Sequence, residues 1–257
     1  PQATFGDVTL PRTRLHYVKT GGGPPLVIVP ATVSLIRQWL PLAQIMGQRF
    51  TSYFFELPGH GKSTPYPNKF ESRLVPPTVE AFMNAMGHDT FNLMGFSFGG
   101  LLALRTLEHL QDRVEKVILL SPCVSWRALK WSWHQQWFFK ASVKVMKNSY
   151  VLRGTHHIMN MSYLETPLTY AISKVSNVDQ RILKHKNAIH LPLSTLDVFT
   201  YTMDEILEME YQYSGAPFKI PCYFGMSVND DLLDYNLTEQ IVRGHFEQIT
   251  IQRFTHP

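Results

Sequence analysis

The sequence contains a serine in a setting that suits nucleophilic chemistry. The segment Gly95-Phe96-Ser97-Phe98-Gly99 matches the pattern G-x-S-x-G and lies between an apolar strand pattern and a helical pattern. The glycines suit a strained turn, because side chains two residues before and after the serine would crowd each other. The motif predicts that the turn lifts the Ser97 hydroxyl toward the N-terminus of the following helix. The alternative is a glycine-rich helix start without chemistry.

A serine nucleophile needs a base, an acid that orients the base, and donors for an oxyanion. Asp230 follows a late apolar strand pattern and is the predicted acid, with Asp231 second and Asp234 third. His256 follows the final strand pattern and is the predicted base. The order serine, aspartate, histidine is the one expected for this kind of turn on an α/β scaffold. The alternative is that these are ordinary loop carboxylates and a surface histidine near a terminus.

Alternating strand and helix patterns must position these residues. Short β-branched runs predict strands, and apolar residues spaced by three or four predict helices. The predicted strands cover 26–29, 51–57, 90–95, 114–120, 221–226 and 248–253, and the predicted helices cover 36–47, 78–86, 99–110 and 236–243. This alternation predicts an α/β fold with a mostly parallel sheet, helices on both faces, and a ligand site at the carboxyl edge of the strands.

The alternation stops after residue 123 and resumes near residue 216. We therefore predict an α/β core formed by residues 1–123 and 216–257, with residues 124–215 inserted as a helical cap over the sheet edge. The excess positive charge gathers in this region, because residues 116–164 contain seven Lys or Arg and no Asp or Glu. Four of the five tryptophans fall within residues 126–137.

Trp133 and Trp137 recur at helical spacing in the predicted cap. One interpretation is a plain lid helix that packs on the core. The other is an apolar wall that binds an acyl group, or a weak contact of the basic cap with a lipid surface, because a basic amphipathic helix with tryptophan suits a membrane interface. We name both tryptophans as candidate substrate-binding residues.

Together these patterns resemble the α/β-hydrolase superfamily over nearly the whole chain. The segment Glu56–Ser63 is similar to the D-x-P-G-x-G-x-S segment that follows the fourth strand in that family. Trp39 stands where the family often has a tryptophan in its first helix. The resemblance implies an α/β-hydrolase fold with a cap, a structural role for His60, and oxyanion donors at the backbone N–H groups of Phe98 and Thr32.

The sequence departs from the family pattern at two places. Pro30-Ala31 replaces the usual His-Gly after the third strand, which changes the backbone freedom before Thr32. Only Pro257 follows His256, whereas the family normally continues into a final helix, so the alternative to His256 is a base that lies beyond Pro257. Ser97 also separates the chain from the haloalkane dehalogenases and epoxide hydrolases of this fold, which use aspartate at that position. Serine implies acyl chemistry.

The predicted function is that of a serine hydrolase, similar to a carboxylesterase or lactonase. It would cleave an ester, lactone or related acyl bond of a small to medium apolar substrate through an acyl-enzyme. The alternatives are a ligand-binding protein on the same fold that does not hydrolyse, and an acyltransferase. No cofactor or metal is expected, because the cysteines and histidines lack the spacing of a zinc finger.

Composition limits the remaining classes. With 257 residues, of which 44% are hydrophobic and 17% charged, the chain is neither disordered nor fibrous. The net charge of +4 is too small to indicate nucleic-acid binding. Cys123 and Cys222 are too few for a disulfide framework and fit a reducing, cytoplasmic location. The apolar runs are too short to span a bilayer.

Overall fold

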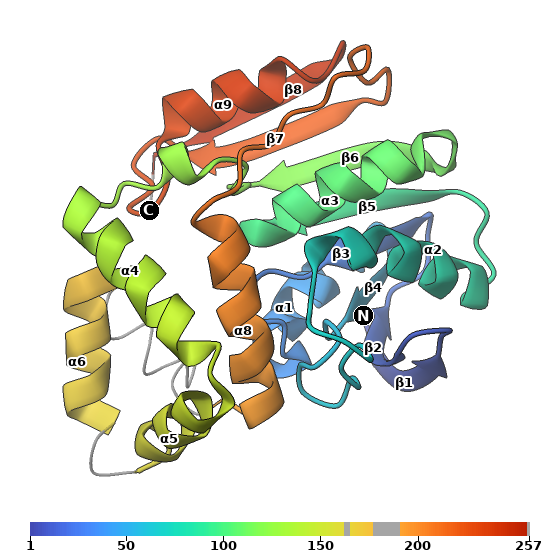
Figure 1. Ribbon diagram of the computed structural model, residues 1–257. Coiled ribbons are helices and arrows are strands. Elements are labelled where there is room, and N and C mark those ends of the chain that lie inside the picture. Colours follow the sequence, from blue (N-terminus) through green and yellow to red (C-terminus); the bar gives the residue numbers. More distant parts are fainter. Residues whose placement is uncertain (162–164, 177–190, 256–257) are drawn as a thin grey trace.

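The protein, seen here as a computed structural model, is built around one mixed sheet (Figure 1). The structure describes residues 1–161, 165–176 and 191–255. The strands in these residues are β1 (Ala3–Thr9), β2 (Arg14–Thr20), β3 (Pro25–Val29), β4 (Thr51–Phe55), β5 (Phe91–Phe96), β6 (Val114–Leu120), β7 (Cys222–Ser227) and β8 (Ile249–Phe254). They lie in the order β1-β2-β4-β3-β5-β6-β7-β8, and all neighbours from β4 to β8 are parallel. The predicted mostly parallel sheet is confirmed.

Helices cover both faces of this sheet, as predicted. The helices of the core are α1 (Ile36–Met46), α2 (Val75–Ala85), α3 (Phe98–His109) and α9 (Tyr235–Arg243). Alternate side chains of β3 show the two faces. Leu26 and Ile28 pack in the cluster with α1, whereas Val27 and Val29 pack in the larger cluster with α2, α3 and α9. Successive side chains point to opposite faces, and both faces are covered by helices, so the buried strands appear in the sequence as continuous apolar runs.

Helix α2 begins earlier than the sequence pattern indicates, and the first two strands were not predicted. Pro76 and Pro77 occupy the first turn of α2, where a missing N–H group costs no intrahelical hydrogen bond. The hairpin of β1 and β2 pairs antiparallel with itself and with β4. Most side chains of β1 are exposed or half-buried, so this edge strand lacks the apolar signal of the others.

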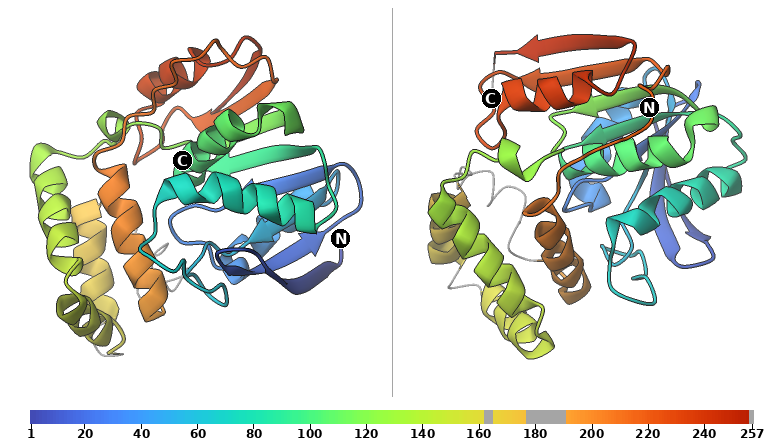
Figure 2. Two further views of the ribbon diagram at one scale, coloured as in Figure 1. Left: turned by 45° about the vertical axis from the view of Figure 1, so that its right-hand side comes forward. Right: turned by 45° about the horizontal axis from the view of Figure 1, so that its top comes forward.

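A second group of helices lies beside the carboxyl ends of the parallel strands (Figures 1 and 2). It contains α4 (Trp133–Met146), α5 (Ser149–Met159), α6 (Glu165–Ser176) and α8 (Leu193–Ile206). Short 3₁₀ turns lie at Ser72–Leu74, Gln111–Arg113 and Trp126–Ala128. No helix in the described segments is both long enough and apolar enough to cross a bilayer.

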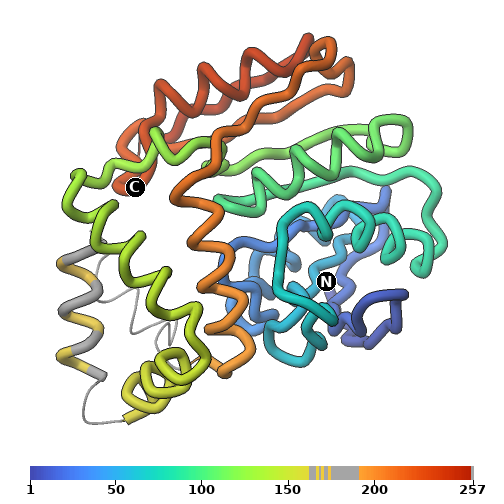
Figure 3. The backbone as a smooth tube through the Cα atoms, in the orientation of Figure 1, coloured from blue at the N-terminus to red at the C-terminus, as the bar shows by residue number. Residues whose placement is uncertain are grey.

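The chain leaves and re-enters the core through two segments that pair with each other (Figure 3). The N–H of Trp126 donates to the carbonyl of Met209, and the N–H of Tyr211 donates to that of Val124, both at 2.8 Å. These bonds close the base of the helical group near the expected boundaries. The division into a core of 1–123 and 216–257 and a cap of 124–215 stays a prediction.

Helix α8 is the part of this group that binds the core. The Glu205 carboxylate accepts the N–H of Ser72 at 2.9 Å and lies 3.4 Å from a guanidinium nitrogen of Arg105. Near the other end of α8, the hydroxyl of Thr195 donates to the carbonyl of Gly59. Because α4 and α5 both contact α8, this helix connects the outer helices to the sheet.

The connection from β5 to α3 is sterically tight. A methyl group built on Gly95 would lie 2.3 Å from the carbonyl oxygen of Gly99, and one built on Gly99 would lie 2.4 Å from the carbonyl oxygen of Val29. The predicted crowding between these glycines is confirmed. Because neither glycine has a side chain, the start of α3 can approach both β5 and the end of β3.

We expect Gly95→Ala to destabilise the protein by about 1–3 kcal/mol or more, because the added methyl meets backbone and must displace it. Gly154→Ala in α5 is the matched control, since a methyl there would meet nothing within 4 Å. The control should be more stable than the parent by about 0.5–1 kcal/mol, because alanine restricts the unfolded chain. Urea unfolding of the two variants measures both changes, and equal stabilities would contradict the packing at Gly95.

Candidate active site

Ser97 occupies a strained turn at the carboxyl end of β5. Its backbone has φ 53° and ψ −125°, which is rare for a residue with a side chain and costs about 1–3 kcal/mol. The surrounding backbone fixes this conformation: the Ser97 N–H donates to Leu120, and its carbonyl accepts from Gly100 and Cys123. The side chain is half-buried, and its hydroxyl makes no hydrogen bond within the described part of the chain.

The two predicted oxyanion donors lie on segments that approach each other. Phe98 is the first residue of α3, so its N–H has no acceptor within the helix. Its side chain is fully buried, which fixes the backbone of this turn. The loop after β3 passes against the same helix start, because a methyl group on Gly99 would lie 2.7 Å from the carbonyl of Pro30. Thr32 follows two residues later in that loop.

His60 supports the loop after β3 through a hydrogen bond to Thr32. The imidazole is fully buried, and its Nε2–H donates to the carbonyl of Thr32 at 3.0 Å. Burial disfavours the imidazolium ion and lowers the pKa of His60 to about 4. The ring is therefore neutral near pH 7 and acts as a hydrogen-bond donor, in agreement with the structural role expected for it.

Glu56 joins the same two loops. Its Oε1 accepts the N–H of Ile36 at 3.0 Å, and its Oε2 accepts the N–H of Lys62 at 2.7 Å. The carboxylate is buried, so these two N–H donors offset part of its lost hydration. Gly61 provides the space, because a methyl group there would lie 2.1 Å from Oε2. The start of α1 is thereby connected to the turn after β4.

Asp230 lies in the loop after β7, at the same sheet edge as Ser97. Its Oδ1 accepts the N–H groups of Leu232 and Leu233, each at 2.9 Å. Oδ2 has no hydrogen-bond partner among the described residues. Burial, with a smaller contribution from the Asp230 charge, raises the pKa of the Cys123 thiol to about 12. The Cys123 N–H also donates to the Ser97 carbonyl. Cys123 is therefore close both to the Asp230 carboxylate and to Ser97.

The other two candidate acids differ from Asp230. Asp234 caps α9, where its Oδ1 accepts the N–H of Leu237 at 2.7 Å, so its carboxylate has a structural partner. Asp231 is exposed. The choice of Asp230 as the acid stays a prediction.

His256, the predicted base, lies outside the described residues. The chain before it is tied to the acid loop at two points. The Asn229 side-chain amide donates to the carbonyl of Thr255 at 2.9 Å, and the N–H of Val228 donates to the carbonyl of Phe254 at 2.9 Å. The residues that precede Asp230 and His256 are therefore hydrogen-bonded neighbours. The role of His256 stays a prediction.

Trp133 and Trp137 are largely exposed on α4. Neither is among the residues that line the cavity between the core and α5 or three smaller cavities of the described residues. Their surroundings therefore give no support to the substrate-binding role predicted for them. The burial of an indole depends on which face of α4 meets α8, and helical spacing alone does not define that face.

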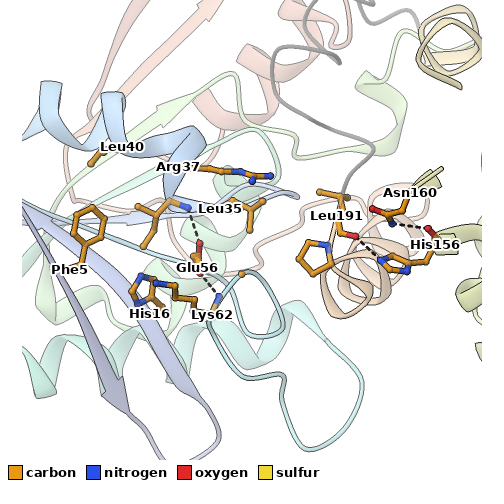
Figure 4. A pocket seen from close by; sticks show the side chains of 13 residues that line it. Phe5, His16, Leu35, Arg37, Leu40, Glu56, Lys62, His156, Asn160 and Leu191 are labelled. Carbon is orange, nitrogen blue, oxygen red and sulfur yellow. Dashed lines mark hydrogen bonds between the residues drawn. The ribbon is translucent and has the colours of Figure 1, made fainter. Parts of the chain in front are cut away.

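Sequence analysis did not find the cavity of about 750 Å³ between the core and α5 (Figure 4). Five separate segments line it, so no local motif marks it. They are the hairpin of β1 and β2, the start of α1, the turn after β4, the end of α5, and residues 191–192 just before α8. His156 of α5 donates through Nε2–H to the carbonyl of Leu191 across one side. Ser97 is not among the lining residues.

The described residues support neither a metal site nor a reactive cysteine thiolate. They contain no group of three or more His, Cys, Asp or Glu side chains arranged to hold a metal ion. Both cysteines are buried and free, and burial raises the pKa of Cys222 to about 12 as well. Neither thiol is ionised near neutral pH.

Comparison with known proteins agrees with the α/β fold described above. The family model described as the alpha/beta hydrolase fold matches residues 24–155, more than half of the chain. The chain belongs to the α/β-hydrolase family. A solved α/β hydrolase from Sphaerobacter thermophilus shares the fold over 98% of this chain and 93% of its own, with a TM-score of 0.71 and 16% sequence identity.

Two curated relatives of this α/β hydrolase match only part of it. An N-formylmaleamate deformylase from Pseudomonas putida is 30% identical over 122 residues, which are 47% of this chain and 46% of the relative. A soluble epoxide hydrolase from Corynebacterium is 27% identical over 107 residues, which are 42% of this chain and 37% of the relative. The matched region thus spans less than half the length of each relative.

The buried His60 predicts a pH-dependent stability. Its pKa is about 4 in the folded protein against an ordinary value of 6.5, so the unfolded chain binds a proton more readily. Stability is therefore present above pH 6.5 and is lost as the pH falls toward 4. This group should lower the free energy of unfolding by about 2 kcal/mol between pH 7 and pH 5.

His60→Gln keeps an amide donor for Thr32 but cannot gain the proton. Urea unfolding at pH 7 and pH 5 should show a fall in stability that is about 2 kcal/mol smaller in the variant than in the parent. Equal falls in both proteins would contradict a neutral, buried His60.

Proposed function

We propose that this protein is a serine hydrolase that cleaves an ester, lactone or related acyl bond of a small to medium apolar substrate. The observation that carries the proposal is the conformation of Ser97. A half-buried hydroxyl is presented at a strained strand-to-helix turn, next to the N–H of Phe98, which has no acceptor within α3. Such a turn costs free energy, and catalysis gives a physical reason for keeping it.

The mechanism assigns one role to each predicted residue. His256 takes the proton of Ser97 as Oγ attacks the carbonyl carbon, and Asp230 orients the imidazole and stabilises its cation. The N–H groups of Phe98 and Thr32 donate to the oxyanion. Collapse expels the alcohol, which takes the proton from His256. A water deprotonated by His256 then attacks the acyl carbon, and Ser97 leaves with the proton as the acid is released.

Asp230 is supported by how its two carboxylate oxygens are used. Oδ1 is anchored by two backbone N–H groups, which fixes the plane of the carboxylate. No described residue binds Oδ2, which would accept an imidazole Nδ1–H. The bond from Asn229 to the carbonyl of Thr255 brings the residue before His256 to this loop, so the base would lie within reach of both partners.

The substrate class follows from the nucleophile rather than from the relatives. One relative is named a deformylase and the other an epoxide hydrolase, so the resemblance alone leaves the reacting bond open. A serine nucleophile favours an acyl carbon. We extend the proposal to a cap formed by residues 124–215 over the site, and to a cytoplasmic location, which two buried free cysteines support.

Ser97→Ala should abolish hydrolysis of p-nitrophenyl esters, lowering turnover by about 10⁴-fold or more. The thermal midpoint should hardly move, because Oγ makes no contact that the described structure needs. Ser121→Ala is the matched control, since Ser121 also has positive φ and lies at the end of the neighbouring strand β6. Turnover near the parental value in Ser97→Ala, or an equal loss in Ser121→Ala, would show that the nucleophile is misassigned.

Asp230→Asn should lower turnover by about 10³–10⁴-fold, because an amide cannot stabilise the imidazolium that forms during attack. The amide oxygen can still accept the N–H groups of Leu232 and Leu233, so the loop should keep its shape. Asp231→Asn is the control and should leave turnover within about twofold of the parent. Steady-state ester hydrolysis of both variants decides the assignment, and a larger loss in Asp231→Asn would reverse it.

A further inference from the structure

Helix α4 presents large apolar side chains to solvent. Trp133 is 71% exposed, Trp137 is 68% exposed, and Phe138 and Val145 are 49% and 55% exposed. Exposed apolar residues are ordinary when scattered singly, but two adjacent indoles on one helix are not. Helix α8 lies between α4 and the sheet, and α4 and α6 lie on the side of the helical group that is away from the sheet (Figures 1 and 2).

The orientation of α4 is fixed by its inner side. Val143 is buried, and the ring of Phe139 stacks on Trp131 with centroids 4.4 Å apart. The capping box formed by Ser132 and Gln135 fixes where the helix begins. The packing of the inner side of α4 therefore holds the exposed side chains outward.

Basic side chains lie on the same exposed side of α4 as the two tryptophans. Trp133, Trp137, Lys140 and Lys144 are spaced by four, three and four residues, which places them on one side of the helix. Both lysines are exposed, and Lys140 also lies 5.8 Å above the ring of Trp126. No acidic residue occurs in α4 or anywhere in 116–164.

Acidic groups of neighbouring elements do not neutralise the lysines on the exposed side of α4. Asp204 of α8 forms an ion pair with Lys147 at 2.5 Å, on the side of α4 that faces α8. The carbonyl of Asp230 accepts a bond from Lys130, which lies before the helix. No described carboxylate lies within ion-pair distance of Lys140 or Lys144. This exposed side of α4 is thus both apolar and positive.

We propose that the outer face of α4 docks on the surface of a lipid bilayer that carries anionic headgroups. This face comprises Trp133, Trp137, Phe138, Lys140, Lys144 and Val145. Indoles favour the boundary between headgroups and acyl chains, and lysine side chains extend from that depth to the phosphates. The proposal concerns binding alone and does not require Ser97 to be a nucleophile.

Charge and shape favour a bilayer over a protein partner. A second copy of this face would bring two further lysines into the same interface with no described carboxylate to pair them, and like charges repel in a dry interface. A single exposed helix side is a convex ridge, whereas protein interfaces seat aromatic anchors in pockets. A bilayer accepts a ridge because lipids rearrange around it, and its anionic headgroups supply the opposite charge.

Vesicle flotation tests the proposal with the full chain. Large unilamellar vesicles of phosphatidylcholine alone would be compared with vesicles in which about a third of the lipid is phosphatidylglycerol. The parent protein should float with the anionic vesicles, and added salt should weaken the binding. Lys140→Gln with Lys144→Gln should lower the partition coefficient by about 30-fold, at about fivefold for each charge. Trp133→Ala with Trp137→Ala should lower it by about tenfold or more.

Matched controls lie elsewhere on the molecule. Arg49→Gln with Lys69→Gln removes the same charge, and Ile45→Ala removes an apolar side chain that is 60% exposed on α1. Both controls should bind vesicles as the parent does. Because the changed side chains of α4 are exposed, all variants should fold, and circular dichroism would verify this.

Three results would overturn the proposal. The parent could fail to float with anionic vesicles, or the two α4 variants could bind as well as the controls. Light scattering after size exclusion could also show a dimer that Trp133→Ala with Trp137→Ala dissociates, which would make this face an interface between copies of the chain. A changed acyl-length preference with unchanged vesicle binding would instead assign the tryptophans to substrate.

Discussion

The close approach of backbone segments around Gly95 and Gly99 is the constraint on which the site depends. Because neither residue has a side chain, α3 begins almost in contact with the ends of β5 and β3. In this turn Ser97 adopts φ 53°. The same geometry presents the serine hydroxyl, leaves the N–H of Phe98 without an acceptor in the helix, and brings the loop that carries Thr32 beside this turn.

Buried polar groups keep the neighbouring loops in place. Glu56 connects the start of α1 to the turn after β4, and His60 supports the carbonyl of Thr32. Both groups are buried, so losing either would leave backbone donors or acceptors unpaired away from water. Helix α8 then rests on the same turn through Thr195 and Gly59. The positions of the oxyanion loop and of the outer helices therefore depend on one cluster of hydrogen bonds.

Local patterns in the sequence were sufficient for the buried part of the fold. The central strands β3, β4 and β5 are buried along nearly their whole length, and the glycines of the β5–α3 turn have a single steric explanation, so both could be predicted. The exposed hairpin of β1 and β2 carries no comparable signal. The surroundings of Trp133 and Trp137 depend on how α4 packs against α8, and the cavity beside Arg37 and Lys62 is assembled from segments far apart in the chain. Such features arise only from tertiary contacts.

The role of Ser97 as a nucleophile is tested most directly by covalent labelling. A fluorophosphonate reacts only with a serine whose hydroxyl is activated, and peptide mass spectrometry identifies the modified residue. The geometry of the β5–α3 turn predicts a single adduct on the peptide that contains Ser97, with none formed after Asp230→Asn at the same exposure time. A label on another serine, or no label on the folded parent protein, would contradict the assignment of this turn as the catalytic centre.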